Sequence, residues 1–416
     1  MKGAIMKLSY ASCAAIILAL AAPAQARGRE AGPVTLTWPD ILAAIDGHPA
    51  IALASARTGH AMAGATESPV GNPEISGSVG MGVSADGQER AVIWGIDVGI
   101  ALDEIPSRIA MRRAALADAE AEQAKAAQIR SEVVAMLHEA FINASIRREI
   151  EVASREAAAA ATELAEVAKS RHQAGEGRKI DVMRLEYDAE ISKGRLSGAV
   201  LERQAAFGRL NRLLGSRLPE SFDIDCDWAA LPEIAGLDDL LAAGIDSNPA
   251  VRAANADARA GHAVLSAERA RLVPGFRIGG FYERELDADK FGASLSMTIP
   301  LWDHNRKGIN QAAARVAGAR AEADLARLDY SDRLASAHAR ASISRETAIR
   351  YRDVVLPLAE QASAMAVALY KAGENGLVET IDARAACAQA RMQMLDAFLE
   401  GWRAAIELQA ITGVTP

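Results

Sequence analysis

The residues best suited to catalysis or metal binding are scattered along this chain of 416 amino acids. Its seven histidines are His48, His60, His138, His172, His262, His304 and His338. None forms an HxxxH pair or stands beside a cysteine, and the chain has no CxxC element. Zinc sites and nucleophilic active sites need such ligands, or a nucleophile and its base, within reach of each other. The sequence therefore predicts no enzyme activity, no cofactor and no metal site.

The sulfur-containing side chains also favour packing over chemistry. Cys226 and Cys387 lie outside the N-terminal leader, and the long helix expected around Cys387 would hold the two thiols far beyond disulfide reach. We therefore expect both thiols to be free. Met392 and Met394 are two residues apart and would lie on different sides of a helix, which is more typical of packing than of a metal relay.

Residues 1–26 have the features of a cleaved secretory signal. Lys2 and Lys7 give a positive start, Tyr10–Ala22 is an apolar run too short to span a bilayer, and Ala24–Ala26 is a small-residue cleavage site. Loss of the two lysines would leave 44 basic and 54 acidic residues, a net charge of −10. That acidic balance argues against a nucleic-acid partner.

Two very long helices between Glu104 and Gly215 are the elements around which the chain is organised. No proline follows Pro106 in the first arm, and the larger apolar residues of Ile129–Phe141 recur at steps of three and four. At ~1.5 Å per residue, Glu104–Ala174 would span roughly 105 Å. An ordinary surface helix with a generous boundary is the alternative. Periodic runs well beyond ~25 residues, however, are typical of coiled coils and repeats.

A tandem duplication accounts for the rest of the chain. The matching segments are Arg171–Asp181 with Leu369–Glu379, Arg209–Gly215 with Glu407–Gly413, and Ile45–Ala50 with Ile245–Ala250. Matches in the same order at offsets of 198 to 200 residues indicate two copies of one unit of about 200 residues.

The duplication predicts the domain organisation. Residues 27–235 form a first repeat with a helix at Trp38–Glu67, a β-hairpin at 73–102, a long helical hairpin at 104–215 and a linker. Residues 236–416 form a second repeat with a helix at Leu237–Leu272, a β-hairpin at 275–301 and a long helical hairpin at 303–413.

The expected strands alternate between apolar and small or polar residues. Val92, Trp94, Ile96 and Val98 alternate with a set that includes Gly95 and Asp97, and Phe281 in the second repeat breaks the pattern. Strands of about ten residues with one apolar face are typical of membrane strands around a wet lumen, so the four apolar residues are expected to face lipid. A soluble, half-buried sheet would alternate in the same way. Because four strands cannot close a barrel, we favour several chains sharing one.

These features together resemble the TolC-like outer-membrane efflux factors over essentially the whole mature length. The resemblance is carried by the two-fold repeat, His48-Pro49, Asn248-Pro249, the segment Ile299–Arg306 and the two Ala-Gly-Glu turns. Two further segments, Asn72–Ile75 and Val355–Glu360, are similar to the heavy-metal (cobalt–zinc–cadmium) branch of that family.

The resemblance implies a mainly α fold with a small β part. Three chains would build a periplasmic α-barrel of about twelve helices and a transmembrane β-barrel of about twelve strands. The protein would be an outer-membrane homotrimer in contact with lipid, with most of the chain in the periplasm. It would be a passive exit duct for heavy-metal cations, working with a periplasmic adaptor and an inner-membrane pump.

The resemblance also assigns roles to residues at the two turns. Arg171 and Gly175 match the family's periplasmic tip, and with Tyr370 and Gly373 of the second turn they are the expected adaptor contacts. A glycine at such a turn commonly takes a positive φ.

Acidic positions that narrow the periplasmic end of such ducts fall on Glu379 and Asp382, with Asp181 as the first-repeat equivalent. Glu379 and Asp382 are three residues apart and share one helix face. The alternative is an ordinary helix start that the helix dipole stabilises. Asn375 stands where the family has a basic residue, so the closing contacts would differ here.

Two other functions remain compatible with the sequence. A drug- or protein-export channel would have the same fold, and a periplasmic structural coiled coil would have the same helices with a covered soluble sheet. Pro357 lies inside a helical pattern and is expected to break one backbone hydrogen bond and bend that helix.

Overall fold

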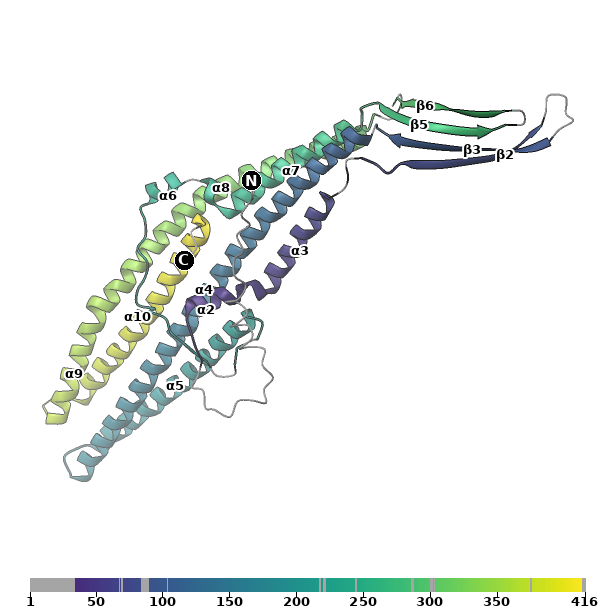
Figure 1. Ribbon diagram of the computed structural model, residues 1–416. Coiled ribbons are helices and arrows are strands. Elements are labelled where there is room, and N and C mark those ends of the chain that lie inside the picture. The colour runs from purple at the N-terminus through teal and green to yellow at the C-terminus, as the bar shows by residue number, and fades with distance from the viewer. Residues whose placement is uncertain are drawn as a thin grey trace, which may run out of the picture. The chain divides into compact units, whose positions relative to one another are not determined.

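Long helices and two small sheets make up the computed structural model. It describes residues 34–66, 68, 70–83, 90–102, 104–216, 218–219, 222–243, 245–285, 288–299, 302, 304–374 and 376–413. The α-helices are α2 (Trp38–Ala44), α3 (Pro49–Gly64), α4 (Glu104–Gln173), α5 (Lys179–Leu213), α6 (Leu237–Ala243), α7 (Pro249–Ala270), α8 (Arg306–Arg350), α9 (Leu356–Ala372) and α10 (Leu377–Thr412) (Figure 1). The strands are β1 (Val34–Leu36), β2 (Glu74–Val83), β3 (Arg90–Ala101), β4 (Phe222–Ile224), β5 (Gly275–Arg284) and β6 (Asp289–Thr298). The expected signal at 1–26 lies outside the described residues.

Internal contacts divide the described residues into two compact units. Of the described residues, unit 1 draws on 34–49, Val134–Glu233 and Ala341–Ile406, and unit 2 on Ala50–Val133, Ile234–Arg340 and 407–413. The long helices α4, α8 and α10 contribute residues to both units.

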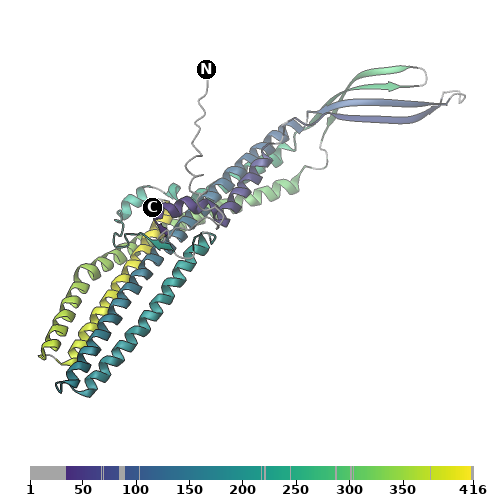
Figure 2. The ribbon, with the colours of Figure 1, turned by 60° about the horizontal axis from the view of Figure 1, so that its bottom comes forward.

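Unit 1 is built from two helical hairpins, α4–α5 and α9–α10. Their helices run side by side, with α10 and α4 between α9 and α5 (Figures 1 and 2). Near the turns a buried cluster joins all four helices, and its members are Ala161, Leu164, Ala165, Ala168, Val182, Leu185, Ala189, Tyr370 and Leu377. Small alanines at this packing surface let the helix backbones approach closely. Most of the stability of these long helices comes from such packing.

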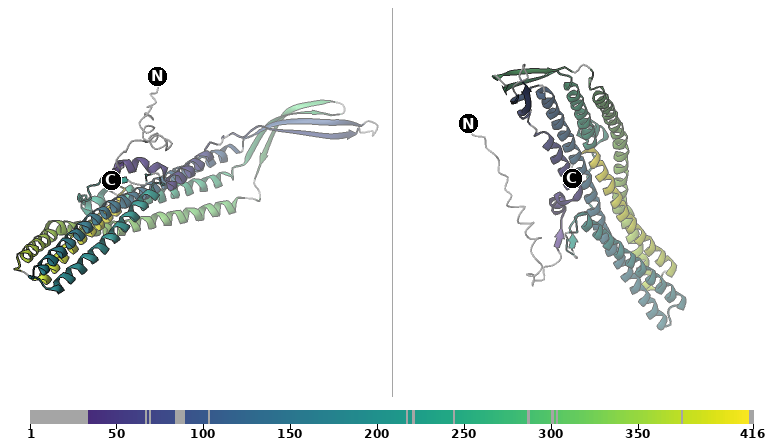
Figure 3. Two further views of the ribbon diagram at one scale, coloured as in Figure 1. Left: turned by 90° about the horizontal axis from the view of Figure 1, so that it is seen from below. Right: turned by 90° about the vertical axis from the view of Figure 1, so that its right-hand side faces the viewer.

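A pair of three-residue strands, which the sequence pattern did not predict, also belongs to unit 1. β1 pairs in parallel with β4, with Val34 opposite Phe222 (Figure 3, right). Arg148 of α4 secures the pair, because its Nη1 donates to the carbonyl of Ile224 at 2.8 Å and lies 3.2 Å from Asp223 Oδ1. Strands this short carry too few residues for an alternation to be read from sequence.

The continuous helices predicted at Trp38–Glu67 and Leu237–Leu272 are wrong in one respect, because each is interrupted before a proline. Short 3₁₀ turns at Ile45–Gly47 and Ile245–Ser247 precede α3 and α7. His48 takes extended backbone angles, as residues before proline commonly do. The interruption therefore follows from His48-Pro49 and from its second-repeat equivalent.

Asn248 stabilises the helix interruption in the second repeat. Its Oδ1 accepts from the backbone N–H of Val251 at 2.9 Å, which caps α7, and its Nδ2 donates to the carbonyl of Ile411 at 2.7 Å. The side chain therefore caps one helix and holds it to α10 at the same time.

The helix break expected at Pro357 takes the form of a π-helical turn. Residues Tyr351–Val355 widen the helix between α8 and α9, and Pro357 follows in the first turn of α9. Proline has no N–H to continue the α-helical pattern, so a local change of hydrogen bonding is the expected result.

Unit 2 contains a four-stranded antiparallel sheet in the order β2-β3-β5-β6. The register places Trp94 opposite Val79 and Ile96 opposite Gly77 and Tyr282. Every second residue therefore falls on the same side of all four strands.

The two faces of this sheet differ sharply. One face carries large apolar side chains that are exposed: Ile75, Val79, Met81, Val92, Trp94, Ile96, Val98, Ile100, Phe276, Ile278, Phe291, Leu295 and Met297. The other face carries mostly glycine, serine and charged residues, with Ile93 and Phe281 as large apolar exceptions; Phe281 lies over Gly292 and was expected to break the alternation.

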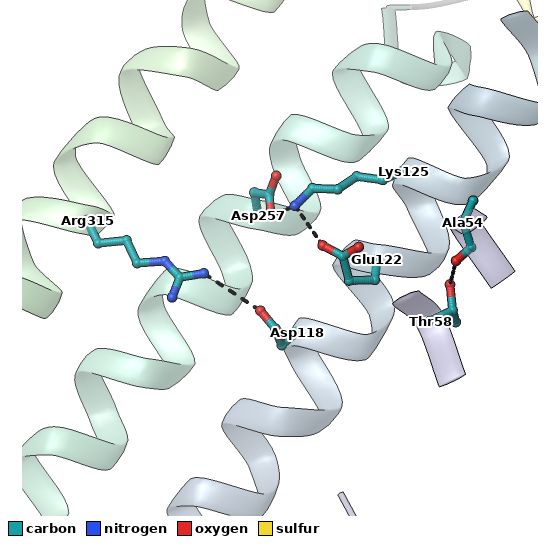
Figure 4. Close-up of polar contacts among 7 residues, drawn as sticks. All are labelled: Ala54, Thr58, Asp118, Glu122, Lys125, Asp257 and Arg315. Atoms are coloured by element: carbon teal, nitrogen blue, oxygen red, sulfur yellow. Dashed lines mark hydrogen bonds and ion pairs between the residues drawn. The ribbon is translucent and has the colours of Figure 1, made fainter. Parts of the chain in front are cut away.

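Charged side chains tie α4 to its neighbours in unit 2. Lys125 Nζ lies 3.0 Å from Glu122 and 2.8 Å from Asp257 of α7, while Arg315 of α8 lies 3.7 Å from Asp118 (Figure 4). Burial alone would lower the pKa of Lys125, but its hydrogen bonds to Asp257 and Glu122 outweigh burial and raise that pKa.

The architecture confirms a mainly α fold with a small β part and an internal two-fold repeat. The helices and the strand pairs recur in the same order in both halves. Among the described helices, none combines the length and the apolar character needed to span a membrane.

Candidate functional site

The two turns of unit 1 end in the same backbone conformation. Gly175 has φ of +82° and Gly373 has φ of +81°, both in the left-handed region that side chains rarely tolerate. The N–H of Glu176 bonds back to the carbonyl of Arg171, and that of Glu374 bonds to the carbonyl of Leu369, both at 2.9 Å. Each hairpin therefore reverses through the same glycine-dependent helix cap.

Arg171 connects the two turns. Its Nη1 donates to the carbonyl of Tyr370 at 2.7 Å, and its guanidinium lies 5.4 Å from the centre of the Tyr370 ring. A Cβ built at Gly373 would lie 3.3 Å from Arg171 Nη2, so this glycine also leaves room for the contact. The predicted tip residues Arg171, Tyr370 and Gly373 are thus together, while Gly175 stands clear of other side chains.

Two further contacts hold the hairpins at this end. Lys371 Nζ lies 3.0 Å from Glu163 of α4, and the hydroxyl of the fully buried Thr380 lies between the carbonyls of Gly376 at 3.0 Å and Ala366 of α9 at 3.3 Å. Sequence reasoning missed Lys371 and Glu163. The two residues are 208 positions apart, and no local pattern links them.

The candidate constriction residues lie at the starts of α5 and α10. Asp181 forms a two-pronged pair with Arg178, both contacts being 3.1 Å. The carboxylate of Glu379 folds back over Gly376 at the start of its own helix, whereas Asp382 is exposed one turn later. Of the three carboxylates, Asp382 therefore has the fewest local contacts to satisfy it.

A cavity of about 580 Å³ lies among all four helices, further from the turns. Arg384 lines it, and its Nη1 is buried without a hydrogen bond, 3.7 Å from Asp188 Oδ2. Arg391 and Glu156 close one side with a 2.6 Å ion pair between α10 and α4. The pairs link residues of different hairpins, so they resist separation of the two hairpins.

The thiols show no sign of reactivity. Both Cys226 and Cys387 are free. Burial raises the pKa of Cys226 to about 11, despite a hydrogen bond from Ser145 that acts in the other direction. Burial also raises the pKa of Cys387, and the charge of Glu360 adds to that effect. Within the described residues, no group of three or more His, Cys, Asp or Glu side chains could hold a metal ion.

The predicted lipid-facing residues share one side of β3. Val92, Trp94, Ile96 and Val98 are all exposed in the single chain, and the Trp94 ring lies 5.4 Å from that of Tyr282 on β5. These side chains form a continuous exposed apolar surface, which is unfavourable in water.

Comparison with known proteins shows what the chain is similar to. Residues 240–414 match the family described as outer membrane efflux protein. The cobalt-zinc-cadmium resistance protein CzcC of Cupriavidus metallidurans is 26% identical over 316 residues, which cover 74% of this chain and 75% of that protein. The nickel-cobalt-cadmium resistance protein NccC of Alcaligenes xylosoxydans is 37% identical over 105 residues, 25% of this chain and 23% of that protein.

Solved structures with the same fold are outer membrane channels. CusC aligns with a TM-score of 0.73 at 16% identity, covering 93% of this chain and 95% of CusC. The open state of the Neisseria gonorrhoeae MtrE outer membrane channel aligns with a TM-score of 0.72 at 18% identity, covering 91% of this chain and 89% of MtrE. The duplicated helical hairpins, the two-faced sheet and these alignments show that the chain has the TolC-like fold, and its residues 240–414 match the outer membrane efflux protein family.

Proposed function

We propose that the chain is the outer-membrane duct of a three-part efflux system, through which heavy-metal cations leave the cell. The metal assignment rests on the similarity to CzcC and NccC, whose names state resistance to cobalt, zinc, nickel and cadmium. The duct is passive, and an inner-membrane pump delivers its cargo through a periplasmic adaptor. A cleaved signal at residues 1–26 directs export of the chain.

The four-stranded sheet is the observation that supports this proposal most strongly. It has one face of exposed apolar side chains and one face of glycine, serine and charged residues, and four strands leave two open edges. Lipid would satisfy the apolar face, and strands from other chains would remove the edges, since unpaired backbone groups are costly in a membrane. Three copies give a closed barrel of twelve strands around a wet lumen.

The outer helices of unit 1 support the same assembly. α5 and α9 form its two sides (Figure 2). Each carries a row of exposed apolar side chains. The rows consist of Ile180, Met183, Tyr187, Ile191 and Leu201 on α5, and of Leu358, Met365 and Leu369 on α9. Steps of three and four along α5 place its row on one helix face. Packing the α5 row of one chain against the α9 row of the next generates a closed ring.

The turns and the acids complete the duct. Gly175 and Gly373 shape the hairpin ends that dock the adaptor, with Arg171 and Tyr370 holding the two ends together. Glu379, Asp382 and Asp181 line the constriction at that end. Opening requires the hairpins to separate, so it breaks the contact between Arg171 and Tyr370.

Deletion of the gene tests the function directly. We expect the deletion strain to lose tolerance to cobalt, zinc or cadmium, and the wild-type gene to restore it. The protein should fractionate with the outer membrane as a detergent-resistant trimer. If metal tolerance is unchanged but drug tolerance or protein secretion is altered, the protein is an export channel for another substrate. If the protein is recovered from the soluble periplasm, it is a structural coiled coil and not a duct.

Arginine substitutions on the two sheet faces test the membrane placement. Ile96→Arg places a charge on the apolar face and should destabilise the folded state by about 2–4 kcal/mol if it lies near the midplane. Ser76→Arg, on the opposite face, is the matched control and should cost far less. Urea unfolding in lipid vesicles measures the stability of both variants. Equal losses of stability would mean that the sheet does not lie in the membrane.

A further inference from the structure

The glycine-rich face of the sheet holds one polar network that crosses all four strands. Arg277 of β5 lies with Nη1 2.8 Å from Glu74 of β2 and Nη2 3.5 Å from Asp97 of β3. Ser294 of β6 donates its hydroxyl to Asp97 Oδ2 at 3.3 Å. One guanidinium is therefore shared between two carboxylates.

Two glycines make this arrangement possible. A Cβ built at Gly99 would lie 2.8 Å from Arg277 Nε, and one at Gly279 would lie 2.7 Å from Ser294 Oγ. Because neither position has a side chain, Arg277 and Ser294 lie flat across the neighbouring strands and do not project from the sheet. The network is thus a thin charged layer on the glycine-rich face of the sheet.

The three charged residues of the network lie on this part of the polar face, and Glu283 of β5 extends over Gly95 beside it. Between 74–78, 95–101, 275–281 and 292–298, the charged residues are Glu74, Asp97 and Arg277 alone. The next basic residue on that face, Lys290, is at the far end of β6 and pairs with Glu285 at 2.5 Å. Without Arg277, each chain would present two negative charges here, and with it only one.

We propose that Arg277 is the ion-selectivity-determining residue of the strand part of the duct. Its guanidinium occupies the place between Glu74 and Asp97 that a passing cation would otherwise take. A lumen lined by low-dielectric walls focuses the field of such charges, so one charge per chain changes the local cation concentration. Arg277 lets cations pass without being retained. This inference rests on the proposed duct function.

The alternative role for Arg277 is a cross-strand ion pair that only stabilises the sheet. Arg277 is 32% exposed, Asp97 30% and Glu74 65%, and pairs this exposed usually contribute little stability. A purely structural role would change thermal stability and leave ion selectivity unchanged. Selectivity therefore separates the two roles.

Reversal potentials in planar bilayers with a potassium chloride gradient test the proposal. The background is Glu379→Ala/Asp382→Ala, so that acids at the turns do not mask the sheet. Arg277→Gln makes the network more negative and should raise the potassium-to-chloride permeability ratio roughly two-fold or more. Glu74→Gln/Asp97→Asn makes it positive and should lower that ratio. Arg277→Lys should keep the parent value.

Arg284→Gln is the matched control, because it removes one positive charge from β5 outside the network, where Arg284 pairs with Asp289 at 3.6 Å. It should leave the permeability ratio unchanged. Channels whose ratio is the same across the whole charge series would overturn the role of Arg277. Absence of any channel from the parent protein would instead overturn the proposed duct.

Discussion

At the scale of single residues, His138 shows how burial determines chemistry. Its ring is 5% exposed, stacks on Trp38 with centroids 4.3 Å apart, and meets Trp402 edge-on at 5.6 Å. Nδ1 has no hydrogen-bond partner, and burial lowers the pKa of His138 to about 4. The histidine therefore acts as an uncharged packing residue that holds α2 against α4, and a cation there would have no counter-charge.

Acid should consequently loosen α2. An unfolded histidine has a pKa of about 6.5, so between pH 6.5 and 4 the unfolded chain binds the extra proton. Stability must then fall as the pH falls through that window, by at most about 3 kcal/mol. Thermal unfolding and hydrogen exchange of residues 38–47 should show this loss in the wild type. His138→Phe should reduce it, and an equal acid response in both proteins would contradict the assignment.

At the scale of elements, the turns show why a helical hairpin needs particular residues. Gly175 and Gly373 have the same φ to within a degree but different surroundings: a Cβ built at Gly175 would meet nothing within 4 Å, while one at Gly373 would lie 3.3 Å from Arg171 Nη2. A valine at either site must adopt a left-handed backbone that β-branched residues disfavour. At Gly373 it must also displace Arg171.

Valine substitutions at the turns should therefore abolish export and spare assembly. Gly175→Val distorts only the exposed turn, so trimer formation and membrane insertion should remain normal while metal tolerance is lost. Gly318→Val, at an exposed position of α8 where a built Cβ meets nothing within 4 Å, is the control for adding a valine elsewhere. Metal-tolerance assays and detergent gels measure the two properties. Export at wild-type rates in both turn variants would refute adaptor docking at the turns.

The elements themselves were largely readable from the sequence. Long helices and alternating strands leave strong periodic patterns, and the repeat set the order of the second half. The breaks at His48 and Asn248 could have been found, since each precedes a proline. The contacts of Arg171 with Tyr370 and of Arg277 with Glu74 could not, because they depend on how residues about 200 positions apart come together. The sequence allowed two interpretations of the acids at the turns: a channel constriction or an ordinary helix start. In the single chain, the position of Glu379 over Gly376 fits a helix start, whereas Asp382 fits the constriction better.

At the scale of the whole molecule, selectivity at the turn end depends on three chains meeting at one axis. Glu379 and Asp382 would then contribute up to six carboxylates, which attract cations and exclude anions through a focused field. The two acids should not contribute equally. Both are exposed, but Glu379 folds back over Gly376 at the helix start, whereas Asp382 lies one turn further along.

We therefore expect a cation-selective channel whose preference depends more on Asp382 than on Glu379. In planar bilayers, Glu379→Ala/Asp382→Ala should weaken cation preference and reduce block by divalent cations added from the periplasmic side. Asp382→Ala alone should produce most of that change. Asp396→Ala/Glu400→Ala removes the same charge further along α10 and is the matched control, expected to keep wild-type block. If the first double variant behaves like this control, the two acids are ordinary helix-start residues and the constriction lies elsewhere along the duct.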